Sequence, residues 1–517
     1  MELDRRDALK AAALGGIGLA SAPLRADRLP AGHFINPIIA GDRPDPAILK
    51  DGADYYLTFS SFDAYPGLTI WHSRDLVHWQ PRAPALTRNI GSVWAVSLEK
   101  HQGRYFLYIP VKAQQNDIFV SHADHIDGPW SDPEPLGLHS HIDPCHAVAE
   151  DGSRWLFLSG GDRVPLSDDG LRVAGPVEHV YDPWHYPPDW PEDYPVEGFS
   201  PEGPKVLRRG GWFYLITAVG GTAGPPTGHM VIAARSRSLH GPWQQHPGNP
   251  LVRTRSEREA WWSRGHASLV EAPDGSWWAL YHGYKAGFWT LGRQCLLDPV
   301  EWRADGWFHM TGGDLSRPLV APGGGTALPH GLTLSDNFTA PLKLGTKWTF
   351  FRPEADETGR ASAAGGVLRL KARGNAPSSG SPILLNTGDT SYSFECDIEI
   401  DPGTTAGLVL FYDEKLYCGL GFDHTRFVTH QYGIERARPA NPHGARMRMR
   451  ITNRRHIVSI HTSGDSGATW QRFDRGREVS GYHHTVRGGF LSLKPGLYAS
   501  GSGEARFRDF QYKALTD

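Results

Sequence analysis

Three acidic residues begin similar segments of this chain and carry the side chains that proton-transfer chemistry uses. Asp45 and Asp143 each precede a proline, and Glu202 precedes Gly-Pro. If three carboxyl groups are buried together, desolvation and mutual repulsion raise the pKa of at least one of them. That group then suits the role of general acid at neutral pH, while an ionised neighbour serves as base. The residue types therefore indicate paired acid and base catalysis, provided that the fold brings them together.

Each of these residues also has a structural interpretation. An Asp-Pro pair often only caps a turn, but its recurrence at Asp45 and Asp143 favours a shared site. Glu197 is also followed by glycine and is an alternative acid, although only Glu202 has a proline and a strand after it. His266 begins another such segment, and a lone histidine is either a core residue or a neighbour of a metal ion.

The acidic residues belong to a motif that recurs five times in the first three hundred residues. Each copy consists of a short apolar strand, a glycine-containing turn and a second strand rich in aromatic residues, which is typical of a β-hairpin. A fixed repeat of this kind indicates the fold class directly. The five copies begin at Asp45, Trp94, Asp143, Glu202 and His266.

Tryptophans recur in turns further along three of the repeats, at Trp79, Trp130 and Trp243. We expect them to pack between neighbouring sheets. A spacing of about 50 to 60 residues suits four-stranded blades, so five copies predict a five-bladed β-propeller. The first strand of each blade lines the channel of a propeller, and the five residues that begin the copies should therefore converge on one axial pocket.

A change of pattern divides the chain after the repeats. Proline and glycine concentrate in residues 316–333, which predicts a linker or a strap, and strands of period two follow, as in Ser393–Ile400. The sequence therefore predicts an all-β protein, with a propeller over residues 31–315, a linker over 316–333 and a β-sandwich over 334–517.

The first 30 residues resemble a twin-arginine export signal. Arg5 and Arg6 precede a weakly hydrophobic run, Ala11–Ala22, that is too short to span a bilayer. We expect a periplasmic or secreted protein, with a frayed N-terminal helix as the alternative. Few disulfides are expected: of the four cysteines, Cys396 and Cys418 lie in the same downstream domain, and the sequence does not decide whether they pair.

The charge balance indicates an uncharged partner. The chain has 53 Lys and Arg against 56 Asp and Glu, a net charge of -3, so the attraction that a nucleic acid or an anionic membrane would use is missing. Its 18 Trp and 18 Tyr residues supply aromatic faces, which suit the apolar faces of sugar rings. We expect an oligosaccharide partner and neither nucleic acid nor membrane. The oligomeric state stays open.

In their order along the chain, the motifs resemble those of glycoside hydrolase family 43, the xylosidases and arabinofuranosidases. Arg43-Pro-Asp45-Pro, His141-Ile-Asp143-Pro and Glu202-Gly-Pro-Lys205 are similar to its three catalytic motifs. The resemblance implies that Asp45 is the general base and Glu202 the general acid. Asp143 would raise the pKa of the acid and orient it.

The resemblance also implies the sugar-binding residues, which are Phe62, Trp94, Arg293 and His229. Arg293 would alternatively pair with a channel carboxylate without touching sugar. His266 would lie on the axis, near a water molecule or a structural Ca²⁺ ion, and the chemistry itself needs no cofactor. The downstream domain resembles the concanavalin-like sandwich of the β-xylosidase branch.

The chain departs from the family pattern at several positions. Valine follows Trp94-Ala where the family commonly has proline, and Lys205 stands where histidine is frequent. An insertion over residues 183–199 precedes Glu202, and its Trp184 and Trp190 either pack at the rim or form a platform for sugar. The substrate is therefore less firmly indicated than the chemistry.

The sequence favours an inverting exo-glycoside hydrolase that releases terminal pentose, β-D-xylose or α-L-arabinofuranose, from plant-type oligosaccharides. Two alternatives stay open. Fructan and sucrose hydrolases also join a propeller to a sandwich, but the repeats lack their Asn-Asp-Pro and Glu-Cys motifs. A non-catalytic glycan-binding propeller would be favoured if one of the three carboxylates had been replaced.

Overall fold

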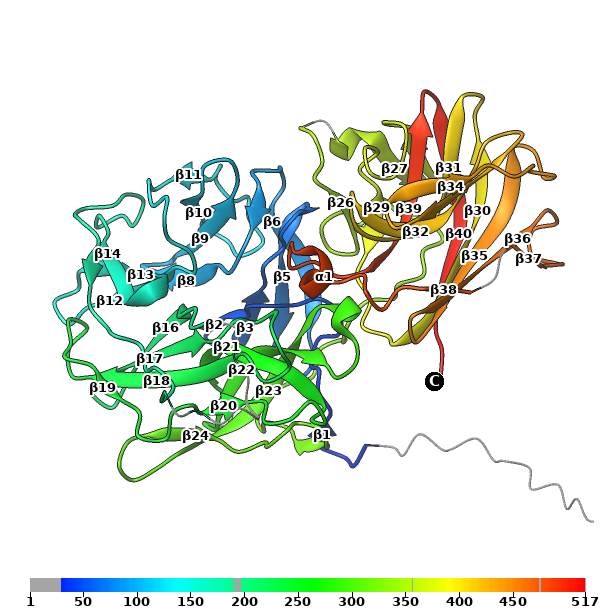
Figure 1. Ribbon diagram of the computed structural model, residues 1–517. Coiled ribbons are helices and arrows are strands. Elements are labelled where there is room, and N and C mark those ends of the chain that lie inside the picture. The colour runs from blue at the N-terminus through cyan, green and yellow to red at the C-terminus, as the bar shows by residue number, and fades with distance from the viewer. Residues whose placement is uncertain are drawn as a thin grey trace, which may run out of the picture.

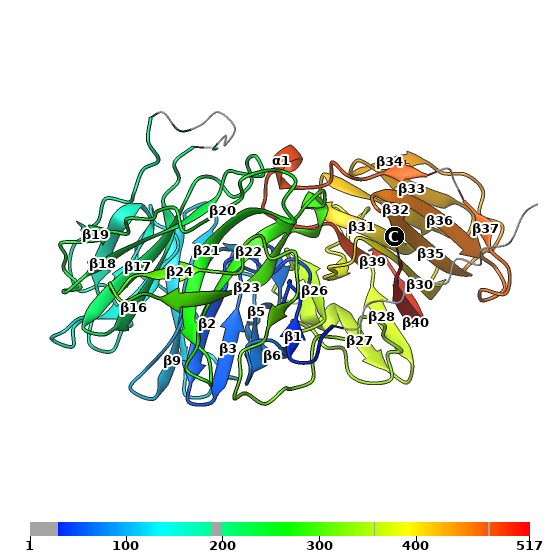
Figure 2. The same ribbon diagram turned by 90° about the horizontal axis from the view of Figure 1, so that it is seen from below.

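The computed structural model describes residues 29–188, 190, 196, 198–355, 357–473 and 476–516. A five-bladed propeller and a two-sheet sandwich lie side by side (Figure 1 and Figure 2), and α1 (His484–Arg487) is the one α-helix among these residues. The prediction of an all-β propeller followed by a sandwich is confirmed. The predicted export signal falls almost entirely outside the described residues. Within them, no helix has the length and apolar character that a membrane span requires.

Each blade is an antiparallel sheet whose first strand in the chain lies at one end of the strand order. Blade 1 contains β2 (Ala47–Asp51), β3 (Asp54–Thr58), β5 (Gly67–Ser73) and β6 (Gln80–Leu86). Blade 2 contains β7 (Ser92–Val93), β8 (Ser97–His101), β9 (Arg104–Lys112), β10 (Asp117–Ala123) and β11 (Glu134–Pro135). Blade 3 contains β12 (Cys145–Val148), β13 (Arg154–Phe157), β14 (Asp162–Pro165) and β15 (Glu178–His179).

The last two blades have longer inner strands. Blade 4 contains β16 (Glu202–Arg209), β17 (Trp212–Val219), β18 (Met230–Ser236), β19 (Gln244–Gln245) and β20 (Val252–Arg253). Blade 5 contains β21 (Trp261–Glu271), β22 (Trp277–Lys285), β23 (Arg293–Trp302) and β24 (Phe308–Met310). The strands that contact one another around the ring are β2, β8, β12, β16 and β21, so residues at their starts face a common axis.

Hydrophobic cores fill the spaces between adjacent blades. Trp79 is fully buried between blade 1 and blade 5, where Trp278 belongs to the same cluster. Trp130 packs against the core of blades 1 and 2, and Trp243 against that of blades 3 and 4. The recurring tryptophans therefore hold neighbouring blades together, as expected from their position in the repeat.

The segment after blade 5 is a strap that lies on the propeller. Its β25 (Leu319–Val320) pairs with β1 (His33–Phe34), which ties the two ends of the propeller together. Further along, the Gly323 amide donates to Asp274 Oδ2 at 2.6 Å, and the Gly331 amide donates to the carbonyl of Trp79 at 2.8 Å. Because these contacts reach blades 5 and 1, the strap is part of the propeller surface.

Two eight-stranded antiparallel sheets form the sandwich. The first runs in the order β34 (Ile434–Ala437), β33 (Phe427–Gln431), β32 (Leu416–Phe422), β31 (Thr404–Asp413), β39 (Lys494–Gly501), β29 (Ile383–Leu385), β26 (Trp348–Phe351) and β4 (Ala64–Tyr65). The second runs in the order β27 (Ala361–Ala364), β28 (Val367–Lys371), β40 (Glu504–Ala514), β30 (Ser391–Ile400), β35 (Arg446–Arg454), β36 (Ile457–Ser463) and β37 (Gln471–Arg472), and β38 (Arg477–Glu478) also pairs with β36.

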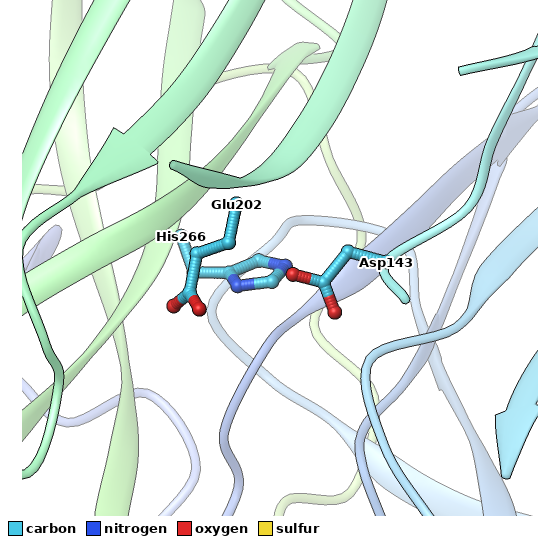
Figure 3. Close-up of side chains that lie close together, drawn as sticks. All are labelled: Asp143, Glu202 and His266. Carbon is cyan, nitrogen blue, oxygen red and sulfur yellow. The ribbon is translucent and has the colours of Figure 1, made fainter. Parts of the chain in front are cut away.

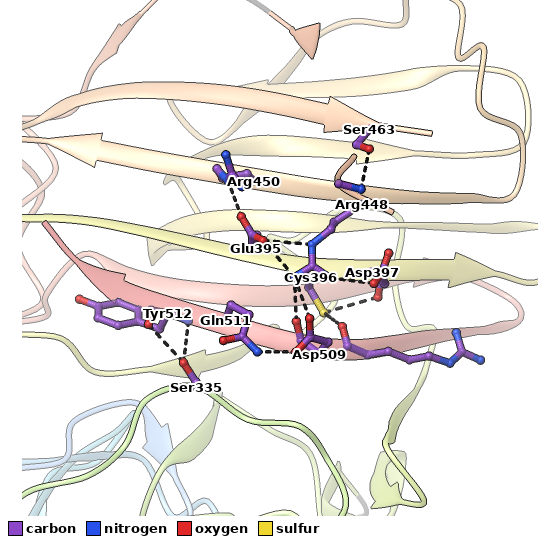
Figure 4. A network of polar contacts seen from close by, with 12 residues as sticks. Ser335, Glu395, Cys396, Asp397, Arg448, Arg450, Ser463, Asp509, Gln511 and Tyr512 are labelled. Atoms are coloured by element: carbon purple, nitrogen blue, oxygen red, sulfur yellow. Dashed lines mark hydrogen bonds and ion pairs between the residues drawn. The ribbon is translucent and has the colours of Figure 1, made fainter. Parts of the chain in front are cut away.

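Buried and partly exposed side chains alternate along β30, so one face of this strand joins the sandwich core and the other is polar. The Arg448 guanidinium lies on that face and forms ion pairs with Glu395 at 3.0 Å, Asp397 at 2.7 Å and Asp509 at 2.9 Å (Figure 4). Cys396 points inward, and its thiol contacts the Arg508 carbonyl at 3.1 Å. All four cysteines are buried thiols, so the pairing of Cys396 with Cys418 that the sequence left open does not occur.

The two domains share one sheet. Strand β4 leaves blade 1 and pairs with β26 of the sandwich, in the register Phe350 to Tyr65. Beside it Arg352 forms an ion pair with the buried Asp63 at 3.0 Å, and at α1 the Thr485 hydroxyl donates to the Ala223 carbonyl at 3.0 Å. The sandwich is therefore held rigidly against the face of the propeller from which the loops of blades 1 and 4 emerge.

Replacement of Trp79 tests the packing between blades. Trp79→Ala should lower the free energy of unfolding by about 3–5 kcal/mol, because it empties a fully buried indole site. Urea-induced unfolding followed by fluorescence measures this change. Trp130→Ala, at the half-buried equivalent position in blade 2, is the matched control and should cost clearly less; equal losses would contradict the proposed difference in packing.

Candidate active site

A pocket at the centre of the propeller collects most of the residues singled out from the sequence. Asp45, Asp143 and Glu202 arrive from blades 1, 3 and 4 and all line it. The other lining residues are Phe62, Trp94, Ala95, Ile142, Thr222, His266, Arg293 and Phe490. The pocket has about 300 Å³ of space between its lining atoms, including its open mouth.

Unusual backbone conformations aim several of these side chains at the axis. Asp45, Asp143 and His266 have φ values of 57°, 55° and 60°, and Phe62 has 46°. A residue with a side chain pays about 1–2 kcal/mol for this left-handed conformation, and such strain gathers at functional sites. Asp45 and Asp143 adopt it at the same position of their repeats, just before β2 and β12.

Glu202 reaches the pocket through an irregularity at the start of β16. The register of β16 against β17 shifts between Glu202 and Lys205, and Gly203 has a φ of 63°. A Cβ on Gly203 would lie 2.8 Å from the His266 ring, so this position requires glycine. The Gly203 amide donates to Asp143 Oδ2 at 2.9 Å. The bulge therefore turns Glu202 inward and links blades 3 and 4 (Figure 3).

Asp45 is surrounded by groups that favour its ionised form. Arg293 donates to its Oδ1 at 2.9 Å, and the Ser60 hydroxyl donates to its Oδ2 at 2.5 Å. Burial alone would raise the pKa of Asp45, but Arg293, His266 and His282 outweigh it and hold the pKa well below the usual value. Asp45 is therefore a carboxylate in the resting site.

The other two acids experience the opposite effect. Burial, followed by the negative charge of Asp45, raises the pKa of Asp143 to about 7, against the opposing effect of the Gly203 amide and Lys205. Burial, then Asp143 and Asp45, raise the pKa of Glu202 well above its usual value. The pocket thus combines a carboxylate at Asp45 with a carboxylic acid at Glu202 near neutral pH.

Aromatic rings form one wall of the pocket, and one of them comes from the sandwich. Phe490 lies between α1 and β39. Its ring centroid is 5.3 Å from that of Trp94 and 6.2 Å from that of Phe62. The Arg293 guanidinium lies over Phe490 at 5.3 Å. Because the sandwich supplies this ring, the pocket is complete only with both domains in place.

His229 lies behind the pocket wall and does not line the pocket. It precedes β18, has no exposed side-chain surface, and places Nε2 at 3.7 Å from Glu202 Oε1. His229 therefore contacts Glu202 from outside the pocket lining, where the resemblance implied a sugar-binding residue.

The insertion before Glu202 packs on blade 4. Trp184 and Trp190 contact each other with ring centroids 6.0 Å apart, and both pack against a cluster that includes Met230. Neither lines the pocket, so the interpretation as rim packing fits the structure. Glu197, the alternative acid, lies outside the described residues.

Two residues beside the acids were not singled out from the sequence. His282 on β22 accepts the Asp45 amide at its Nδ1, 3.1 Å away, and its Nε2 lies 3.0 Å from the Thr222 hydroxyl. Nothing in the sequence of the aromatic-rich strand that contains His282 indicated a role in the site. Nothing indicated one for Phe490 either, because its position depends on how the two domains pack.

One potential metal-ligand atom from each of Asp143, Glu202 and His266 lies within 4.8 Å of the others. They fit Ca²⁺ poorly. This ion takes about six to eight oxygen ligands, whereas the group consists of two carboxyl groups and one imidazole. His266 Nε2 is buried without a hydrogen-bond partner among the described residues, an arrangement that one small polar molecule would satisfy.

Comparison with known proteins agrees with this geometry. Residues 34–308 match Glycosyl hydrolases family 43. The chain belongs to this family. Residues 335–513 match the Beta xylosidase C-terminal Concanavalin A-like domain, which confirms the predicted type of sandwich. The protein is therefore a family 43 glycoside hydrolase, as the catalytic motifs indicated.

Several relatives span almost the whole chain of this family 43 enzyme. A non-reducing end alpha-L-arabinofuranosidase of Bacteroides ovatus is 29% identical, and the match spans 91% of this chain and 92% of the relative. A putative beta-xylosidase of Escherichia coli is 26% identical, and the match spans 93% of this chain and 99% of the relative. The crystal structure of the family 43 protein BlXynB from Bacillus licheniformis superposes with a TM-score of 0.82 at 25% identity, covering 93% and 100%.

Replacement of Asp45 tests the electrostatics of the site. Asp45→Asn should lower the free energy of unfolding at pH 7 by about 3–5 kcal/mol, because Arg293 is left buried without its counter-charge. The folded-state pKa of Asp45 is depressed, so its contribution is complete above the unfolded pKa of about 3.9 and is lost as the pH falls below it.

The difference between wild type and Asp45→Asn should therefore shrink from about pH 4 downward, as measured by urea unfolding at a series of pH values. Asp151→Asn, at an exposed turn of blade 3, is the control and should change stability little. A difference that stays constant or grows in acid would rule out the depressed pKa.

Proposed function

We propose that this family 43 enzyme cleaves glycosidic bonds with Asp45 as general base and Glu202 as general acid. The observation that carries the proposal is that Asp45, which Arg293 contacts at 2.9 Å, and Glu202 line one pocket. In these surroundings the pKa is lowered at Asp45 and raised at Glu202. Asp143 supports the acid in two ways. Its charge raises the pKa of Glu202, and its bond to the Gly203 amide fixes the start of β16.

The proposed reaction is a single displacement at the anomeric carbon. Asp45 takes a proton from a water molecule, and the water oxygen bonds to the anomeric carbon while the bond to the leaving oxygen breaks. Glu202 gives its proton to that leaving oxygen. The sugar is released with inverted configuration, and no metal ion takes part in these steps.

The shape of the pocket supports an exo mode of action. One wall is closed by Phe490 of the sandwich, and the space of about 300 Å³ is small. We infer that one terminal sugar ring enters, packs against Trp94, Phe62 and Phe490, and is held through Arg293. The names of the relatives support pentose as that sugar, as either arabinofuranose or xylose.

The substrate is accordingly an oligosaccharide of plant type. Export through the signal proposed at Arg5 and Arg6 would bring the enzyme to such material outside the cytoplasm.

The acid is tested by Glu202→Gln. Phenyl β-D-xyloside and phenyl α-L-arabinofuranoside are assayed side by side, and the variant should lose about 10²- to 10⁴-fold in kcat on whichever is the better substrate. Glu271→Gln is the control, because Glu271 lies at the far end of β21 in an exposed ion pair with Lys50. An unchanged rate in Glu202→Gln would remove this residue from the mechanism.

The stereochemistry is tested by proton NMR of the first sugar formed. Since Asp45 activates water directly, a β-xyloside should release α-xylose before mutarotation. If β-xylose appears first, one of the carboxylates acts as a nucleophile and the role of Asp45 as base is wrong.

A further inference from the structure

His229 is placed so that it acts on Glu202. The Nδ1 atom of His229 lies 2.5 Å from the Gly220 carbonyl oxygen. A carbonyl oxygen only accepts, so Nδ1 carries the proton. Burial, followed by the neighbouring His282, lowers the pKa of His229 to about 3, and the ring is neutral. The second nitrogen, Nε2, therefore presents a lone pair.

The ring of His229 is closely packed at its place beside Glu202. On one side, a Cβ at Gly265 would lie 1.8 Å from His229 Cδ2, so the backbone of β21 presses against the ring edge. On the other side, the His282 ring lies parallel at a centroid distance of 5.3 Å and an angle of 4°. Between them, Nε2 is buried without a hydrogen-bond partner among the described residues, 3.7 Å from Glu202 Oε1.

A lone pair at this place distinguishes the two forms of Glu202. An ionised carboxylate facing it is repelled, whereas a protonated carboxyl donates to it after moving closer by less than 1 Å, as catalytic hydrogen bonds in resting sites often must. We infer that His229 is a positioning residue: its Nε2 accepts a hydrogen bond from the protonated Glu202 carboxyl in the resting enzyme and so keeps the acid protonated and oriented. The inference rests on the proposed role of Glu202.

The proton balance of this arrangement is simple. During the reaction the Glu202 O–H turns from His229 to the leaving oxygen and gives up its proton there, while His229 keeps its own proton on Nδ1. The ionisable groups that face the pair from the surrounding strands are Asp45, Asp143, His266, His282 and Arg293.

The test is His229→Asn, which keeps an amide near Nδ1 to bond Gly220 and lacks any atom at Nε2. Acid assistance matters most for poor leaving groups, so kcat on a phenyl glycoside should fall about 10- to 100-fold and kcat on the dinitrophenyl glycoside less than about threefold. The basic limb of the kcat/KM profile should move to lower pH. His246→Asn, at a buried histidine bonded to the Phe308 carbonyl, is the matched control and should change neither.

An equal loss on both substrates with an unmoved basic limb would show that His229 is only structural and would overturn the inference. If His229→Asn does not fold, His229→Gln is used instead. Its amide oxygen reaches the place of Nε2, so it should keep most of the wild-type pH profile and activity. If His229→Gln folds like the wild type but loses activity equally on both substrates, the inference is overturned as well. Glu202→Gln separates the two proposals: full activity there defeats the proposed function, whereas an inactive Glu202→Gln together with a uniform loss in the His229 variant defeats only this inference.

Discussion

The buried pair of Arg293 and Asp45 determines how the rest of the site is charged. Three carboxyl groups buried in one pocket do not all ionise readily, and the guanidinium contacts the one at Asp45. That contact assigns the negative charge to blade 1. The negative charges of Asp45 and Asp143 then favour retention of the proton at Glu202. The division of labour between base and acid follows from where a single arginine on β23 is placed.

The backbone around this pair is built to keep the acids together. Asp45 and Asp143 sit in left-handed conformations, and Gly203 and Gly265 let histidine rings approach the backbone where any side chain would collide. Each of these backbone conformations raises the free energy of the folded state by itself, and each is retained because the packing of the surrounding blades holds it in place. The inter-blade cores with their buried tryptophans supply that support, so the stability of the propeller and the geometry of its axis are linked.

The sequence alone predicted the acids and the fold, because both follow from a repeat. Asp45, Asp143 and Glu202 occupy equivalent positions, and equivalent positions of a propeller meet at its axis. Phe62, Trp94 and Arg293 were implied by family resemblance, and the structure places them in the pocket wall. His229 was expected there too, but it does not line the pocket, and its Nε2 lies 3.7 Å from Glu202 Oε1. Phe490 had no local pattern at all, since domain packing rather than periodicity brings it to the pocket.

The strand that blade 1 lends to the sandwich has a consequence for how such enzymes can be rearranged. With β4 removed, β26 would become the open edge of its sheet, an edge that invites pairing with other chains. A catalytic module cut free at the strap would at the same time lose the phenylalanine that closes its pocket. A sandwich moved onto another propeller would therefore need a loop that pairs with β26 as β4 does here.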